Sequence, residues 1–152
     1  MTAGKKKRVC KDCGNTKRAA KYPGPRCFTC HKQRQAALTA TRRSRHIEQK
    51  FGITEAEYQA IYQAQGGVCY LCRRARGNRR VRLAVDHDHR LARLHNHPAD
   101  QGCRECVRGL LCKKCNRDVL GHLRDDITAF QRCIEYLTNP PARRVLGAFP
   151  RP

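Results

Sequence analysis

The chain has 152 residues, of which 33 are Lys or Arg and 12 are Asp or Glu, so its formal charge is +21 at pH 7. This length fits one domain with a small appendage, and a hydrophobic fraction of 39% without Trp predicts a thin core that needs metals or disulfides. The charge favours a polyanionic partner, usually nucleic acid. A membrane surface is the competing polyanion, but no long apolar stretch or broad amphipathic basic helix is evident, so we expect DNA and no membrane as the partner.

Cysteine spacing predicts metal ligation. Ten of the eleven cysteines fall in five CxxC pairs, and no apolar run follows the basic N-terminus as it would in a signal peptide. Such pairs in an unexported chain favour thiolate ligands over disulfides. We therefore expect a cytoplasmic protein, in a bacterial or phage-infected cell, associated with DNA.

Three segments are expected before the main domain. Residues 1–9 form a disordered basic arm that is either a solvated tail or a phosphate contact. Residues 10–30 have almost no apolar side chains and predict a zinc ribbon or knuckle, with four free thiols as the alternative. Residues 31–50 predict a basic helix, either a solvated linker or a contact to the DNA backbone. The expected zinc ligands are Cys10, Cys13, Cys27 and Cys30, and the expected DNA contacts on the helix are Arg42, Arg43 and Arg45.

The main domain is expected over residues 51–138. Its first helix begins at Thr54, which is placed to form a capping box with Glu57, and ends at two glycines. Tyr58 starts an apolar stripe at helical spacing that predicts packing against the core. Alternating residues over 81–85 predict a strand that leads into Asp86.

The second half of this domain is expected to return as a strand and end in helices. Residues 90–106 are expected to be irregular, 107–111 to form the second strand, and a helix to follow Asn116. A last helix carries an apolar stripe from Ile127 to Leu137, on which Cys133 is expected to pack. Two prolines end it, and residues 139–152 are expected to be a disordered tail. The further expected DNA contacts are Arg79, Arg80 and Arg108.

A metal site and a catalytic site are predicted between the strands. The pairs Cys69/Cys72 and Cys112/Cys115 suit one tetrahedral structural zinc. Asp86 and the Asn116 amide offer hard oxygens for Mg²⁺, His87 can take a proton from water, and His89 could position phosphate. Alternatively both histidines are zinc ligands, which would need a second metal because four cysteines already fill one site.

These residues resemble the recombination endonuclease VII family of HNH, or ββα-metal, nucleases. The resemblance covers roughly residues 50–138 and rests on Asp86-His87-Asp88-His89, on the stretch 107–116 and on Leu120-Gly121. It implies a small, zinc-stabilised α+β fold and the cutting of branched or distorted DNA. It also implies zinc on the four cysteines, Mg²⁺ on Asp86 and Asn116, His87 as general base and His89 in the active site.

Two features depart from that family. A long insert after His89 carries His95, His97, Cys103 and Cys106, which predict a further zinc, with unliganded residues as the alternative. The dimerisation region of the junction-resolving member has no match, so the oligomeric state stays open, with a dimer as one alternative.

The sequence therefore predicts a Mg²⁺-dependent DNA endonuclease with one to three structural zinc ions. The competing hypothesis is a non-catalytic, zinc-stabilised nucleic-acid-binding or regulatory protein. Charge and cysteines fit both, whereas Asp86, His87 and Asn116 together favour the enzyme, because a binding module needs no water-activating cluster.

Overall fold

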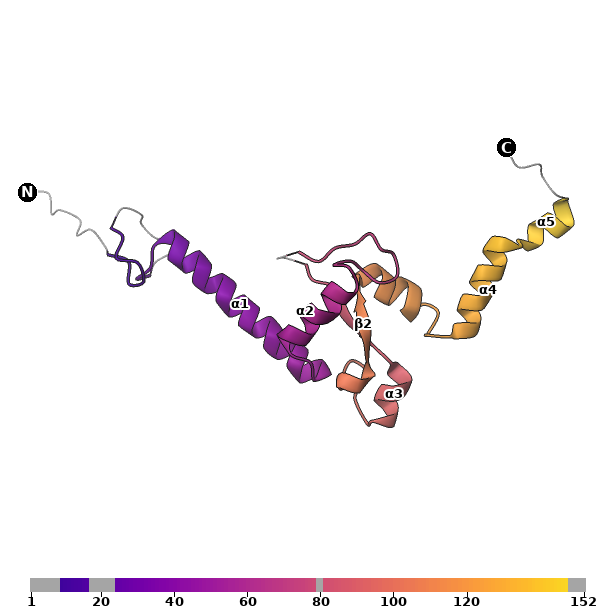
Figure 1. Ribbon diagram of the computed structural model, residues 1–152, viewed down its shortest axis with the longest axis horizontal. Coiled ribbons are helices and arrows are strands. Elements are labelled where there is room, and N and C mark those ends of the chain that lie inside the picture. Colours follow the sequence, from indigo (N-terminus) through magenta and orange to yellow (C-terminus); the bar gives the residue numbers. More distant parts are fainter. Residues whose placement is uncertain (1–8, 17–23, 79–80, 148–152) are drawn as a thin grey trace, which may run out of the picture.

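The computed structural model describes residues 9–16, 24–78 and 81–147. Long helices extend to opposite sides of a small centre formed by α2 and a two-stranded sheet (Figure 1). The expected small α+β fold is confirmed. The N-terminal arm to residue 8, Arg79, Arg80 and the last five residues lie outside the described residues. In chain order the elements are α1 Phe28–Phe51, α2 Glu55–Ala64, β1 Ala84–His87, α3 His89–Leu94, the 3₁₀ helix η1 Arg104–Cys106, β2 Val107–Leu111, the π-helix η2 Cys115–Gly121, α4 Ile127–Thr138 and α5 Pro141–Leu146.

The sheet pairs β1 with β2 in antiparallel register. Ala84 lies opposite Leu111, Asp86 opposite Gly109 and His87 opposite Val107, so Arg108 is an extra residue that forms a bulge in β2. β1 starts at Ala84, three residues later than expected, because its partner strand ends at Leu111, before the second cysteine knuckle.

The core is small and lies between α2 and the sheet. Tyr58 and Ile53 are buried against residues of both strands and against core cysteines. The capping box is confirmed, since the Glu57 amide donates to Thr54 Oγ1 at 3.2 Å and the Thr54 amide donates to Glu57 Oε2 at 2.8 Å. These contacts fix α2 against the strands that carry the candidate site.

A buried amide side chain ties the end of α2 to β2. Gln65 Oε1 accepts from the Leu110 amide at 2.8 Å, and Gln65 Nε2 donates to the Leu110 carbonyl at 2.9 Å. A Cβ on Gly109 would lie 2.9 Å from Gln65 Oε1, so this close approach requires glycine.

Two helices replace segments that were expected to be irregular. α3 starts at His89 and takes up the first part of residues 90–106. The Asp88 carboxylate caps it by accepting from the amides of Arg90 and Leu91, and Asn96 ends it in a left-handed conformation, φ 57°. α5 lies in the expected disordered tail, where Pro141 suits the first turn of a helix.

The other end helices also differ from expectation. α1 begins at Phe28, inside the first cysteine cluster, and ends at Phe51. Among the described residues no helix is both long and apolar enough to cross a membrane.

The stripe on α4 does not pack on a core: Ile127 and Leu137 are 73% and 76% exposed, and Cys133 is exposed as well. The expected packing of Cys133 is therefore wrong, because α4 projects beyond the sheet (Figure 1).

Candidate active site and metal clusters

A cleft of about 680 Å³ lies where β1, α3 and η2 meet. It brings together Asp86 and Asn116, which were predicted to act together, and it includes His89. Carboxylates and arginines share the lining, a combination that suits both a cation and a phosphate. The lining residues are Asp86, Asp88, His89, Arg90, Arg93, Arg108, Asn116, Leu120, Gly121, Arg124, Asp125 and Ile127.

The Asp86 carboxylate is buried and paired with Arg108. Arg108 Nε donates to Asp86 Oδ2 at 2.8 Å and its Nη2 donates to Oδ1 at 3.2 Å, while Nη2 also reaches Asp125 Oδ2 at 3.1 Å. Arg108 was expected to contact DNA, but its guanidinium is paired with two carboxylates within the protein. Asp125 was missed from the sequence; it follows Arg124 in a second consecutive left-handed conformation, φ 52° and 57°.

His87 is buried next to this cleft and is not among its lining residues. Its ring packs 5.5 Å from the Phe51 ring and 4.6 Å from the His89 ring, centroid to centroid. Its Nε2 has no hydrogen-bond partner, and among the described residues it is the one buried side-chain N or O of which this is true. Burial, and then the nearby His89, lower the pKa of His87, while a hydrogen bond with the Ala99 backbone opposes them.

His89 and Asn116 reach the cleft from helix starts. The strand ends at His87 and His89 opens α3, so the two histidines lie in different elements. Their rings are 4.6 Å apart, centroid to centroid, on either side of Asp88. The His89 side chain is about half exposed, with Nδ1 3.9 Å from Asp125 Oδ2. Asn116, Leu120 and Gly121 line the cleft at spacings of four and five residues, which the wide turn of the π-helix allows.

The core cysteine cluster brings together the two CxxC pairs on either side of the sheet strands in the sequence. The sulfurs of Cys69, Cys72, Cys112 and Cys115 lie within 4.8 Å of one another, as the predicted zinc site requires. A hydrogen bond with the Ala75 backbone lowers the pKa of Cys72 to about 6, whereas burial raises the pKa of Cys115 to about 12. One sulfur is thus ready as a thiolate, and the group could hold a zinc ion.

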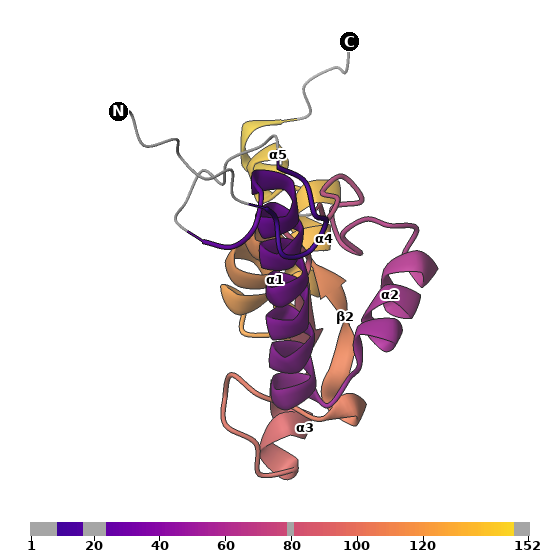
Figure 2. The same ribbon diagram turned by 90° about the vertical axis from the view of Figure 1, so that its left-hand side faces the viewer.

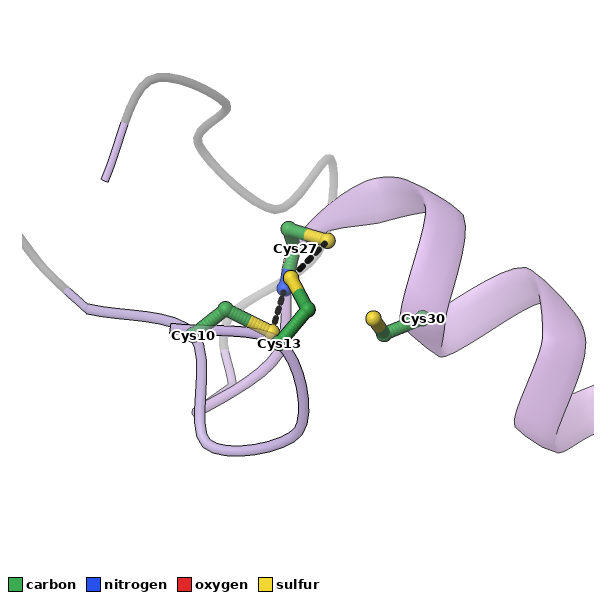
Figure 3. A group of neighbouring side chains, drawn as sticks. All are labelled: Cys10, Cys13, Cys27 and Cys30. Atoms are coloured by element: carbon green, nitrogen blue, oxygen red, sulfur yellow. Dashed lines mark hydrogen bonds between the residues drawn. The ribbon is translucent and has the colours of Figure 1, made fainter. Parts of the chain in front are cut away.

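The N-terminal cluster lies at the far end of α1. Cys10 and Cys13 come from the loop, and Cys27 and Cys30 from the start of the helix (Figure 3). The Cys13 and Cys27 sulfurs are 3.8 Å apart, close to the roughly 3.8 Å edge of a tetrahedral site with Zn–S bonds of about 2.3 Å. The Cys27 amide donates to Cys10 Sγ at 3.2 Å, and this hydrogen bond lowers the pKa of Cys10 to about 6. This group could also hold zinc.

The insert contains the third group. His95, His97, Cys103 and Cys106 present ligand atoms within 4.8 Å of one another. All three predicted clusters are therefore brought together by the fold.

Predicted DNA contacts on α1 border a second hollow. Arg42 and Arg43 line it together with Lys50 of α1 and Arg82 next to β1, and its volume is about 620 Å³. Arg45 lines a separate, smaller hollow with Arg43 and Arg82. Arg82 is committed within the protein, since it pairs with Glu55 at 2.7 Å and lies over the Tyr58 ring.

Comparison with known proteins agrees with this geometry. The family model for recombination endonuclease VII matches residues 44–139, which include the cleft and the core cysteine cluster. The chain belongs to the recombination endonuclease VII family. Membership implies a nuclease, with DNA as its partner.

Two phage proteins are similar over most of their length. The Gene 59 protein of Mycobacterium phage D29 is 47% identical over 146 residues, covering 93% of this chain and 80% of that protein. The Gene 59 protein of Mycobacterium phage L5 is 46% identical with the same coverage. No solved structure matches the chain.

Proposed function

We propose that this endonuclease VII family protein is a Mg²⁺-dependent DNA endonuclease, with β1, β2 and η2 forming its ββα-metal core. One observation carries the proposal. Asp86 of β1 and Asn116 of η2 line one cleft. The residue after Asp86, His87, is buried and its Nε2 has no hydrogen-bond partner. A buried imidazole nitrogen without a partner costs stability, and a catalytic role is one explanation for its retention.

The donor atoms of the cleft fit a hard cation. Mg²⁺ is usually held by one or two protein oxygens and keeps several waters, and Asp86 and Asn116 supply a carboxylate and an amide oxygen. The Arg108 guanidinium contacts both oxygens of Asp86, so this carboxylate takes a cationic partner and Arg108 would compete with Mg²⁺ for it. When bound, Mg²⁺ neutralises charge on the phosphate and on the departing oxygen.

His87 is suited to take the proton of the attacking water at Nε2. Its lowered pKa keeps the ring neutral at physiological pH, as a base must be. The His89 ring lies 4.6 Å from this ring, lines the cleft and is half exposed, so the proposed path for water opens by rotation of His89. In-line attack then leaves a 5′-phosphate and a 3′-hydroxyl.

Arginines around the cleft are proposed to hold the DNA backbone. Arg90, Arg93 and Arg124 line the cleft beside the catalytic groups, and Arg42 and Arg43 extend the basic surface along α1. Branched or recombination-intermediate DNA is the proposed preferred substrate, in keeping with the family. Zinc is proposed for the core and N-terminal cysteine clusters, where it stabilises a core too thin to stand alone.

Cleavage of supercoiled plasmid tests the proposal. Wild type is incubated with Mg²⁺ or with EDTA, beside His87→Ala and Asn116→Ala, and four-way junction, flap and linear duplex substrates are run in parallel. His122→Ala is the matched control, because His122 is exposed at the end of η2 and does not line the cleft. We expect a loss of about 10²- to 10⁴-fold in His87→Ala and no loss in the control. If wild type and variants are equally inert on every substrate, the protein is a binding protein and the catalytic proposal fails.

A further inference from the structure

The third metal-ligating group, in the insert, has the spacing of a tetrahedral site. His95 Nδ1 lies 3.2 Å from Cys103 Sγ and 3.7 Å from Cys106 Sγ, and the two sulfurs are 3.4 Å apart. For Zn–N and Zn–S bonds of about 2.0 and 2.3 Å, tetrahedral edges of roughly 3.5 to 3.8 Å are expected. Two imidazoles and two thiols are the donor set that zinc prefers.

Local backbone structure builds this group from the ends of two short helices. The His97 amide donates to the Ala92 carbonyl at 2.9 Å, which closes the C-terminus of α3 around the left-handed Asn96 and brings both histidines to the same group. η1 brings Cys103 and Cys106 together, with the Cys106 amide donating to the Cys103 carbonyl at 3.0 Å.

An exposed carboxylate lies on the far side of one of the imidazoles, within ion-pair range but beyond hydrogen-bond distance. Nδ1 of His95 faces the sulfurs, and Nε2 on the other side of the ring lies 3.8 Å from Glu105 Oε2. A carboxylate behind the far nitrogen of a histidine is the usual support of a metal-bound imidazole. Glu105 therefore lies where it would support His95 in a metal site.

The segment that connects the two halves of the group, residues 98–102, lies against His87. The Ala99 backbone hydrogen-bonds to the His87 ring, and a Cβ on Gly102 would lie 3.4 Å from His87 Cδ2 and 3.0 Å from Cys106 Cβ. The Gly102 amide also donates to the Lys50 carbonyl of α1 at 2.9 Å. The backbone that supports the proposed base is therefore tethered at both ends by the third group.

The same segment has little else to hold it. Pro98, Ala99 and Asp100 are exposed, so apolar burial contributes little to ordering this stretch. The one ion pair on it, among the described residues, joins Asp100 to Lys50 at 2.6 Å, and the Asp100 side chain is 67% exposed, so the pair contributes little. A metal that joins His97 to Cys103 across the segment would restrain it far more strongly.

We propose that His95, His97, Cys103 and Cys106 bind a zinc ion that holds residues 98–102 against His87 and so positions the His87 ring. The positional part rests on the proposed nuclease function, whereas the zinc site itself does not. The four ligands are positioning residues in this scheme, since none of them lines the cleft.

The test uses the full-length protein, purified and dialysed, with zinc counted by mass spectrometry. His97→Ala and Cys103→Ser each remove a ligand that is not fully buried, and His122→Ala and Cys133→Ser are matched controls that remove an exposed histidine and an exposed cysteine outside all three groups. Amide hydrogen exchange over 98–102 and the kcat and KM of DNA cleavage are measured on the same samples.

We expect each ligand variant to contain one zinc fewer than wild type and each control to match wild type. Exchange over 98–102 should accelerate about tenfold or more, and kcat should fall by about 10- to 100-fold with KM nearly unchanged. An unchanged zinc count in the ligand variants overturns the site. Loss of the zinc without faster exchange or lower kcat overturns the positioning role. If wild type cuts no DNA, the nuclease proposal fails separately, and zinc count and exchange still decide whether a metal restrains the segment.

Discussion

Replacing Arg108 by Gln should destabilise the protein and at the same time strengthen its response to Mg²⁺. Asp86 is 6% exposed, and the guanidinium of Arg108 contacts both of its carboxylate oxygens. The variant leaves a buried carboxylate without its cation. Mg²⁺ would then meet no competitor at Asp86, so binding should restore part of the stability that the substitution removes.

The expected magnitude follows from the burial of the two partners. Breaking a fully buried ion pair costs about 3 to 5 kcal/mol, and an exposed pair is worth about 1 kcal/mol or less. Since the Arg108 side chain is 33% exposed while that of Asp86 is 8% exposed, we expect a loss of about 2 kcal/mol. For a chain of this length that corresponds to a fall in Tm of roughly 4 to 8 °C.

Thermal unfolding followed by circular dichroism, with MgCl₂ or with KCl at equal ionic strength, measures both effects. Arg90→Gln is the matched control, because Arg90 lines the same cleft and is exposed. The double variant Arg108→Gln/Asp86→Asn should recover stability and lose the Mg²⁺ response. The reasoning is refuted if Arg108→Gln is as stable as wild type, or if Mg²⁺ raises the Tm of both proteins equally.

Three further outcomes are expected. Because burial lowers the pKa of His87, the base stays neutral down to lower pH than a free histidine, so the midpoint of the acid limb of kcat/KM should lie below pH 6.5; a midpoint above 6.5 contradicts this. Removal of zinc by a strong chelator should unfold the domain, seen as loss of helical circular dichroism that Zn²⁺ restores and Mg²⁺ does not. Gln65→Leu should cost about 1 to 3 kcal/mol in urea unfolding, because the buried Leu110 amide loses its side-chain partner and the Leu110 carbonyl keeps the longer hydrogen bond from the Tyr70 amide, 3.3 Å. A cost below about 0.5 kcal/mol would show that the Leu110 amide finds another partner.

Features set by local chemistry could be predicted from the sequence. The capping box of Thr54 and Glu57 depends on residues three apart, and the cysteine pairs depend on ligand spacing, so both could be recognised without knowledge of the fold. Asp86 and Asn116 were predicted to lie close together. Asp86 follows a predicted strand, and Asn116 follows a cysteine pair whose partner pair in the zinc site could be identified from the sequence. Their catalytic roles remain predictions.

What was missed depends on contacts between distant segments or on signals that were not used. The pairing of Arg108 with Asp86 arises from a bulge in β2, which no residue pattern specifies. α3 had a readable signal, since Asp88 and Asn96 are residues that favour helix starts and ends, but the interpretation of the segment as irregular did not use it. The exposure of the α4 stripe could not be foreseen, because periodicity shows which residues share a helix face but not whether another element packs on that face.

The length of α1 has a consequence for how far the protein reaches. Its 24 residues rise about 1.5 Å each and span about 36 Å, close to one turn of B-form DNA. Its C-terminal end packs beside the sheet, and its N-terminal end carries the first cysteine cluster (Figure 2). A duplex lying along α1 would therefore present the same face to both ends of the helix, about one helical repeat apart.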